Sequence, residues 1–257
     1  MGRARVLIVA GSDPVAGAGL QADLKTVTAL GGHGMTVVTA ITVQDTSAVT
    51  GVHPVPAELV AEQMRACLQD VGADCVKLGM LATGEIVAAV VGVLEGYPAI
   101  PVVADPVLAG TGGGTLLDAR GREWFLRALV PRVALLTPNL PEAARLTGVA
   151  VDDLDGMREA ASLLLDAGAG AVLIKGGHLP GEELIDLLVD RTGEKTFHAS
   201  RLPGPGFHGT GCVLASAIAT GLAMGRSMPE AVTEGRAHLR AAMTRARALG
   251  KGQWLLG

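Results

Sequence analysis

Short apolar segments rich in β-branched residues alternate with longer segments of helical periodicity along most of this chain. RVLIVAG (5–11) has the length and composition of a buried strand and is ended by a glycine. GLQADLKTVTALGG (19–32) then places Leu20, Leu24 and Val27 at helical spacing before a pair of glycines. Strands that alternate with helices form a mostly parallel sheet with helices on both faces, so we predict an α/β fold.

The same alternation assigns the rest of the chain. The segments 184–191 and 194–200 are predicted to form an antiparallel pair around a turn at Arg191–Gly193. No linker or repeat interrupts the pattern, so we predict one domain that spans residues 1–257. The other predicted strands are 35–43, 74–80, 101–106, 133–139 and 171–177, and the other predicted helices are 56–72, 83–97, 116–130, 140–148, 155–168, 210–225 and 229–248.

The composition excludes several classes of protein. The 257 residues are 49% hydrophobic and 18% charged, which is enough for the core of one large α/β domain. The net charge of −4 and the lack of a basic cluster argue against nucleic acid as a partner. No apolar run reaches the ~18 residues of a membrane span, so no membrane partner is expected. Cys67, Cys75 and Cys212 form no CxxC pair, which favours a reducing cytoplasm over a disulfide framework.

Glycines and polar residues gather directly after the predicted strands. In parallel α/β sheets, ligands bind beyond the carboxyl ends of the strands, where the connecting loops meet. We therefore expect a ligand site at this edge of the sheet. The segments that follow the strands are GSDP, QDT, GML, DPVLAGTGGG, TPNLPE, KGGH and HGTGC.

The last of these segments lies in GFHGTGC (206–212) and stands directly before a long apolar helical segment. Its glycines, Gly209 and Gly211, allow the backbone to bend so that several N–H groups face one point. The helix that follows adds the positive end of its dipole. This segment therefore predicts an anion-binding site, and the alternative is a plain glycine turn ahead of a helix.

A second glycine motif, GAGLQA (17–22), matches the dinucleotide-binding pattern G-x-G-x-x-A. Asp45 follows roughly 20 residues on, where a ribose-binding acid stands in that fold. The spacing disagrees, because SDPVA (12–16) separates the strand from the first glycine. A nicotinamide-dependent oxidoreductase is therefore the alternative from another class, and the sequence has no P-loop motif.

Six blocks occur in a fixed order over about residues 5 to 248: GSDPVAGAGLQADLKT, AITVQDT, KLGML, TPNLPEA, LIKGGH and HGTGC. Together they resemble the hydroxymethylpyrimidine/phosphomethylpyrimidine kinases of thiamine biosynthesis, members of the ribokinase-like superfamily. The resemblance implies a ribokinase-like three-layer sandwich. It also implies ATP-dependent phosphorylation, assisted by Mg²⁺, of 4-amino-5-hydroxymethyl-2-methylpyrimidine and then of its monophosphate. We expect a homodimer whose partners are this small pyrimidine and ATP.

By this resemblance, the backbone N–H groups of Gly209, Thr210, Gly211 and Cys212 hold the phosphoryl group during transfer. Phosphoryl transfer asks a protein mainly for positioning and for stabilisation of charge. AGTGGG (109–114) is expected to form a flap. The resemblance assigns nucleotide binding to Lys175, Asn139 and Thr210, and the metal to Asp105 and Glu142.

The pyrimidine end of the site is assigned to the N-terminal blocks. Asp23 and Gln44 resemble the polar residues that read the ring nitrogens and the exocyclic amine. An aminopyrimidine edge presents donors and acceptors together, and a glutamine amide can match both. Gly11 allows close approach of the backbone, and Met80 and Val107 are expected to line the faces of the ring.

Cys212 stands at the predicted start of a helix, where the dipole and the converging N–H groups favour a thiolate. The wider superfamily generally uses an aspartate as the base at this point. We therefore predict that the sulfur takes the proton from the attacking hydroxyl, or orients the hydroxymethyl group. The alternative is a small buried residue that only packs, whereas a covalent nucleophile is disfavoured because no His–acid pattern accompanies the cysteine.

Lys25 and Lys77 are expected at the surface, and none of the six histidines is expected to act as a base. The chain departs from the family at Val15–Ala16, where Ser-Gly is usual, and at Phe207, where Thr is usual. These changes leave the phosphoryl chemistry in place but bear on the choice of substrate. A kinase of pyridoxal-type alcohols is therefore the alternative within the superfamily.

Overall fold

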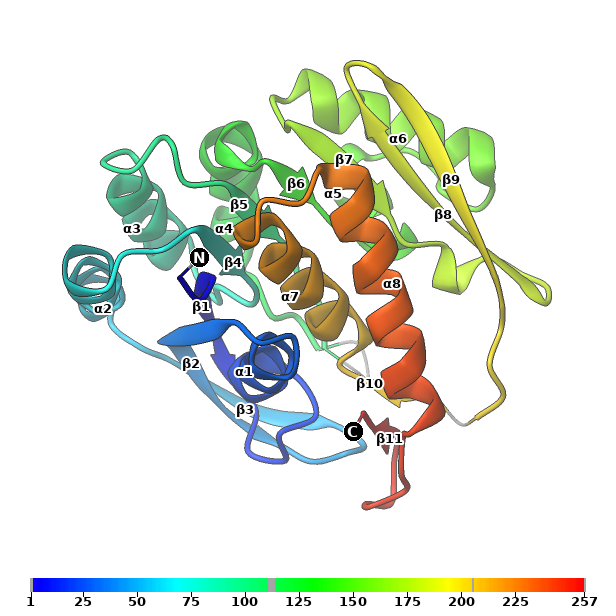
Figure 1. The fold of residues 1–257 in the computed structure, drawn as a ribbon, viewed down its shortest axis with the longest axis horizontal. Helices are drawn as coiled ribbons and strands as arrows, with labels where there is room; N and C mark the ends of the chain where they lie inside the picture. The colour runs from blue at the N-terminus through cyan, green and yellow to red at the C-terminus, as the bar shows by residue number, and fades with distance from the viewer. Residues whose placement is uncertain (1, 111–113, 205, 257) are drawn as a thin grey trace.

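The structure is a computed structural model that describes residues 2–110, 114–204 and 206–256, so the centre of the predicted flap lies outside the described residues. A nine-stranded sheet has the order β3-β2-β1-β4-β5-β6-β7-β8-β9 (Figure 1). The six strands from β2 to β7 run parallel, and antiparallel strands stand at both edges. The strands are β1 (Arg5–Ser12), β2 (His33–Gln44), β3 (Val49–Pro54), β4 (Cys75–Leu78), β5 (Val102–Ala104), β6 (Leu135–Leu136), β7 (Ala171–Ile174), β8 (Glu183–Asp190) and β9 (Gly193–Ser200).

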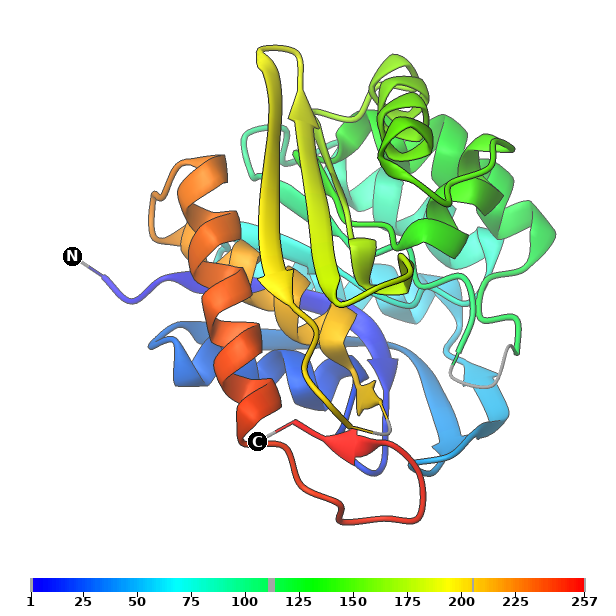
Figure 2. The ribbon, with the colours of Figure 1, turned by 90° about the vertical axis from the view of Figure 1, so that its right-hand side faces the viewer.

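Helices cover both faces of the sheet, which confirms the predicted α/β sandwich (Figures 1 and 2). Successive side chains of a strand point to opposite faces, and β1 shows the result. Val6 and Ile8 pack in a core with α1, α7 and α8, whereas Leu7 and Val9 pack with α2, α3, α5 and α6 on the other side. The α-helices are α1 (Gly19–Ala29), α2 (Ala57–Asp70), α3 (Gly84–Leu94), α4 (Ala119–Trp124), α5 (Leu140–Thr147), α6 (Leu154–Asp166), α7 (Thr210–Ala223) and α8 (Met228–Thr244).

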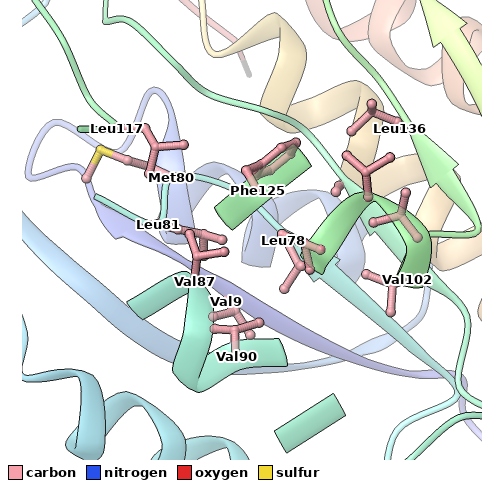
Figure 3. Close-up of a cluster of buried hydrophobic side chains, with 14 of the residues drawn as sticks. Val9, Leu78, Met80, Leu81, Val87, Val90, Val102, Leu117, Phe125 and Leu136 are labelled. Atoms are coloured by element: carbon pink, nitrogen blue, oxygen red, sulfur yellow. The ribbon is translucent and has the colours of Figure 1, made fainter. Parts of the chain in front are cut away.

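The larger core lies between the central strands and the helices of one face (Figure 3). Val9, Leu78 and Val102 come from neighbouring strands and belong to the same cluster as Phe125, and all four side chains are almost fully buried (Figure 3). Burial of an aliphatic or aromatic side chain of this size contributes roughly 1.5–3 kcal/mol. Met80 lies at the border of this cluster, directly after β4, and reaches toward the loops beyond the strand ends.

Three features differ from the predicted elements. β3 was not expected, because VTGVHP (49–54) mixes glycine and proline with polar residues and shows no strand periodicity. The helix predicted at 116–130 is α4 followed by a π-helical turn, Phe125–Leu129. Two very short strands, β10 (Phe207–His208) and β11 (Trp254–Leu255), pair in parallel beside the end of α8 (Figure 2). The predicted pair at 184–191 and 194–200 is confirmed as β8 and β9.

Candidate active site

A cavity of about 380 Å³ opens where the parallel strands end, at the edge of the sheet that the sequence predicts. The loops after β1, β2, β4, β5, β6 and β7 contribute to it, together with the start of α7 and residues near the C-terminus. Twelve of the thirteen predicted site residues line this cavity. They are Gly11, Gln44, Met80, Asp105, Val107, Asn139, Glu142, Lys175, Gly209, Thr210, Gly211 and Cys212.

Two buried carboxylates and a lysine meet in the middle of the cavity wall. Lys175 Nζ lies 2.7 Å from Asp105 Oδ1 and 3.9 Å from Glu142 Oε2. Burial opposes the charge of Lys175, but the two carboxylates outweigh it and raise the pKa of the lysine above its ordinary value. Thr137 Oγ1 lies 3.2 Å from Asp105 Oδ1 and donates a second hydrogen bond to this carboxylate. The cluster is therefore a fixed set of charges at the ends of three adjacent strands.

Glu142 and Asn139 also form the N-terminal cap of α5. The side chain of Asn139 accepts from the Glu142 N–H, and Glu142 Oε2 accepts from the Asn139 N–H at 2.8 Å. Such a capping box satisfies two N–H groups that the helix itself leaves without acceptors. Burial raises the pKa of Glu142 to about 7, and the nearby Asp105 charge adds to the effect that Lys175 opposes. Asn139 and Glu142 thus cap α5, and both also line the cavity.

The start of α7 points its N–H groups into the cavity next to this cluster. The first N–H groups of an α-helix have no acceptor inside it, and the helix dipole makes this end positive. Gly209 has φ +77°, and a Cβ there would collide with the carbonyl oxygen of Gly17. A Cβ on Gly211 would lie 2.7 Å from Asp105 Oδ2 and 3.1 Å from Lys175 Nζ. Both glycines are therefore required for the close approach of α7 to the charged cluster.

The structure does not favour the thiolate that the sequence predicts at Cys212. Burial raises the pKa of the thiol to about 12, with smaller contributions from the Asp23 and Asp105 charges. Lys77 and the Gly19 N–H lower it, but they do not offset the loss of water around the sulfur. Cys212 is half-buried and lines the cavity, so the thiol is placed to touch a ligand in its protonated form.

Asp23 is the predicted site residue that does not line the cavity. It is fully buried in α1, beneath the cavity, where Oδ2 lies 2.7 Å from Lys77 Nζ and Oδ1 accepts from Ser216 Oγ at 2.8 Å. These contacts occupy the carboxylate, so the assignment of Asp23 to ring recognition is corrected. Lys77 was expected at the surface and is also fully buried. Burial opposes its charge, but the Asp23 carboxylate outweighs this and raises the pKa of the lysine.

Gln44, His208 and Asp13 form a second polar group in the cavity wall, and His208 and Asp13 are almost fully buried. The Gln44 amide nitrogen lies 2.8 Å from His208 Nε2, which lies 3.1 Å from Asp13 Oδ2. Met80 contacts Gly11 in the adjacent wall, where added bulk on this glycine would meet the methionine sulfur and methyl group. Gln44 and Met80 thus line the same cavity as Gly11, as the sequence predicts.

Sequence reasoning assigned several of the cavity's polar residues no place in the site, among them Lys77, Asp13 and Gln253. Lys77 is the only charged residue in the buried segment CVKL, which is a signal that could have marked it. Asp13 follows a strand and precedes a proline, and its carboxylate accepts from the N–H groups of Val15, Gly17 and Ala18. Gln253 lines the cavity from the segment after α8, and a lone polar residue there gives no sequence signal.

The dinucleotide-binding alternative is not supported by the geometry. Asp45 does not line the cavity; its Oδ1 accepts from the N–H groups of Ser47 and Ala48 and so closes the turn between β2 and β3. Gln21, within the glycine motif, accepts from the Asp13 N–H and braces the loop rather than leaving room for a pyrophosphate. The loop 12–18 therefore carries a different function.

The sequence of this chain is similar to those of several characterised kinases. A hydroxymethylpyrimidine/phosphomethylpyrimidine kinase of Streptomyces coelicolor is 46% identical over 258 residues, which cover 98% of this chain and 95% of that protein. A thiamine biosynthesis bifunctional protein of Geobacter sulfurreducens is 45% identical over 97% of this chain. The chain spans about half the length of that bifunctional relative, 51%.

Similar solved structures include two kinds of vitamin kinase. A phosphomethylpyrimidine kinase of Clostridium difficile is 36% identical with a TM-score of 0.83, covering 94% of this chain and all of that one. A pyridoxal kinase of Staphylococcus aureus, in complex with AMP-PCP and pyridoxal, is 33% identical with a TM-score of 0.92, covering 100% and 94%. The sequence pattern of the phosphomethylpyrimidine kinases matches residues 13–256. This chain therefore belongs to the phosphomethylpyrimidine kinase family.

Proposed function

We propose that this enzyme uses ATP to phosphorylate the hydroxymethyl group of 4-amino-5-hydroxymethyl-2-methylpyrimidine and then its monophosphate, in thiamine biosynthesis. One observation carries the proposal beyond family membership. The helix start at Gly209–Cys212, the Asp105–Lys175 pair beside it and Gln44 all line one cavity. A small ring bound at Gln44 could therefore direct its hydroxymethyl group at a phosphoryl group held by the helix.

The start of α7 and the charged cluster beside it are suited to hold a transferring phosphoryl group. The N–H groups of Thr210, Gly211 and Cys212 offer fixed donors, and they need no reorganisation as negative charge shifts between oxygens. Lys175 adds a positive charge beside them, held in place by Asp105 at 2.7 Å. A transition state of phosphoryl transfer needs little from a base, so these positioned charges supply most of what the reaction requires.

The carboxylates of the charged cluster, Asp105 and Glu142, fit a magnesium ion of the kind that kinases use. Among the described residues, no group of three or more His, Cys, Asp or Glu side chains is arranged to hold a metal. Kinase-bound Mg²⁺ is held by one or two carboxylates together with substrate phosphates and water, so such a group is not needed. Asp105 and Glu142 would hold the ion. When bound, it neutralises charge on the nucleotide phosphates and fixes their orientation.

The sequence suggests two roles for Cys212, proton acceptor or orientation of the hydroxymethyl group, and the second is the better supported. A thiol whose pKa is about 12 is protonated at neutral pH, so forming a thiolate would cost more than general-base help returns. The S–H group can instead contact the substrate hydroxyl and set its direction for in-line attack. We therefore assign Cys212 the orientation of the hydroxymethyl group.

A pyridoxal kinase is the second candidate, because pyridoxal kinase structures superpose on this chain with TM-scores of 0.91 to 0.92. Purified protein with ATP and Mg²⁺ should convert the pyrimidine alcohol and its monophosphate with a higher kcat/KM than pyridoxine or pyridoxal. A higher kcat/KM for the pyridoxal-type alcohols would overturn the substrate assignment. Reduction of NAD by an alcohol without any kinase activity would overturn the reaction class.

We also propose that two chains associate and that the enzyme works in the cytoplasm. Ile41 and Val43 of β2 are 57% and 53% exposed, and being two residues apart they share one face of an edge region of the sheet. Neighbouring exposed apolar side chains are typical of an interface with another protein surface. The three cysteines are free thiols, which is usual in a reducing compartment.

A further inference from the structure

His208 connects three segments of the cavity wall and has no role in the function proposed above. Its side chain is only 5% exposed, and it directly precedes Gly209 at the start of α7. Its Nε2 atom faces two polar groups at once. Asp13 Oδ2 lies 3.1 Å away, and the nitrogen of the Gln44 side-chain amide lies 2.8 Å away.

The carboxylate of Asp13 decides what Nε2 of His208 must carry. Burial alone would raise the pKa of Asp13, but hydrogen bonds from His208 and from the N–H groups of Ala18 and Val15 hold it below its ordinary value. Asp13 is therefore ionised at neutral pH, and an ionised carboxylate can only accept hydrogen bonds. A bare lone pair on Nε2 would face a negative charge, so Nε2 of His208 carries a proton.

The hydroxyl of Thr42 determines which atom of the Gln44 amide must lie next to it, the oxygen or the nitrogen. Its Oγ1 lies 2.9 Å from the Ser12 carbonyl oxygen, to which it donates its single hydrogen. The same Oγ1 lies 3.3 Å from Gln44 Oε1. A hydroxyl has one hydrogen, so Thr42 can only accept from Gln44. The atom of Gln44 that lies next to Thr42 Oγ1 must therefore be the amide nitrogen, which donates a hydrogen bond, and not the oxygen.

A half-turn of the Gln44 amide exchanges the oxygen and the nitrogen at the end of the side chain. The amide oxygen then shares the single Nε2 hydrogen of His208 with Asp13 Oδ2, and the NH₂ group donates to Thr42. We propose that His208 is a positioning residue that locks the Gln44 amide with its oxygen on His208 and its NH₂ group on Thr42. One amide hydrogen is then left for a ligand. The site selects a heteroaromatic ring that presents an unprotonated nitrogen there, and it disfavours a ring edge that offers only a donor.

The protonation of His208 can be measured without any turnover. In protein labelled with ¹⁵N-histidine, the His208 signals are those that disappear in His208→Gln. Long-range ¹H–¹⁵N correlation spectra should then show a proton on Nε2 at neutral pH, in the presence or absence of substrate. A neutral ring with its only proton on Nδ1 would overturn the proposal, whatever the enzyme phosphorylates.

The action of His208 through Gln44 is measured by a double-mutant cycle on the KM of the pyrimidine, which rests on the proposed function. His208→Leu should raise this KM roughly tenfold, since about one hydrogen bond to the ring is lost, while the KM of ATP stays the same. His208→Gln keeps an N–H donor and should recover most of the loss. In the Gln44→Ala background, His208→Leu should add no more than about twofold, the usual error of independent sites.

Full additivity of the two substitutions would overturn the proposal, because His208 would then act on the fold and not through Gln44. Equal impairment in His208→Gln and His208→Leu would overturn it as well. The control is His198→Leu, since His198 is an exposed residue of β9 that does not line the cavity and should leave both KM values unchanged. Failure of the wild-type enzyme to phosphorylate the pyrimidine would count against the proposed function alone, because the NMR result still decides the state of His208.

Discussion

Glu142 belongs to two structures at once, the N-terminal cap of α5 and the charged cluster in the cavity wall. Its carboxyl caps α5 through the Asn139 N–H, and it faces Asp105 and Lys175 across the cavity wall. Burial raises the pKa of Glu142 from 4.5 to about 7 in the folded protein. The folded state therefore holds this proton more tightly than the unfolded chain does. The stability that results is present in full below pH 4.5 and is lost as the pH rises to about 7.

Replacement of Glu142 by glutamine should therefore stabilise the ligand-free protein at high pH. The amide cannot ionise but can still accept from the Asn139 N–H, so the cap is kept. We expect Glu142→Gln to raise the free energy of unfolding by about 2 kcal/mol at pH 8 and by little at pH 5. Urea unfolding at the two pH values measures this. Glu159→Gln, at an exposed position of α6, is the control and should change neither value. A pH-independent effect of Glu142→Gln would contradict the burial argument.

The role of Cys212 is decided by comparing serine with alanine. Serine keeps a hydrogen-bonding group at this position, and alanine removes it. If the thiol orients the substrate, Cys212→Ser should retain most of kcat and Cys212→Ala should lose about tenfold, the value of one hydrogen bond. Steady-state rates with both substrates give the answer. Equal losses of about 10²–10⁴-fold in the two variants, larger for the alcohol than for its monophosphate, would restore the base hypothesis.

The element that most depends on a single residue type is α7. Gly209 precedes it with φ +77° and lies against the Gly17 carbonyl oxygen, whereas Gly225 follows it with φ +80° and has open space around it. The two glycines thus share a backbone conformation and differ only in their surroundings. A matched pair of alanine substitutions can separate the two effects.

Gly225→Ala should cost only the conformational strain, roughly 1 kcal/mol of unfolding free energy, and leave kinetics unchanged. Gly209→Ala should cost more, because its Cβ must push the Gly17 carbonyl away from the start of α7. We expect it to lower kcat/KM for ATP by at least tenfold as the N–H groups lose their positions. Urea unfolding and steady-state kinetics measure both quantities. Similar kinetics in the two variants would show that the geometry of this helix start is not critical.

Elements with a long and regular pattern were predictable, and elements held by tertiary contacts were not. α6 and α7 are visible in the sequence for different reasons. α6 buries one apolar stripe, and α7 buries every residue from Val213 to Gly221. β10 and β11 have two residues each and are defined only by each other. Propensity carries no information at that length, because pairing partners far away in the chain decide the conformation.

The sequence predicted the charged side chains that follow strands and reach the cavity. It did not show which polar side chains the fold buries. Lys175 and Asp105 follow strands and meet as expected. Asp23 and Lys77 lie in equally typical positions, but the fold buries both of them, and their charged atoms pair at 2.7 Å. The pKa of Cys212 depends on how much water the fold removes from the sulfur, and no local pattern records that quantity.

At the scale of the whole molecule, the exposed apolar residues of β2 predict a dimer. Light scattering should give twice the mass of the 26.0 kDa chain at micromolar concentration. Substitution of both Ile41 and Val43 by aspartate should produce monomers, because two charges cannot be buried in an apolar contact without partners. Leu163→Asp is the control, since Leu163 is 41% exposed on α6 and lies outside that surface. A monomeric wild-type protein would contradict the assignment.

The pairing of β11 with β10 has a consequence for the order in which the enzyme becomes active during synthesis. Gly252 and Gln253 donate backbone hydrogen bonds to Thr46, 206 positions earlier for Gly252, and Leu255 packs against Gly17. Contacts across so much chain close late in folding, because the loop entropy must first be overcome. While a ribosome still holds residues 252–255, the sheet can form but this wall of the cavity cannot. We therefore expect a nascent chain to complete its sheet before it completes the cavity, and so to become active only after that last step.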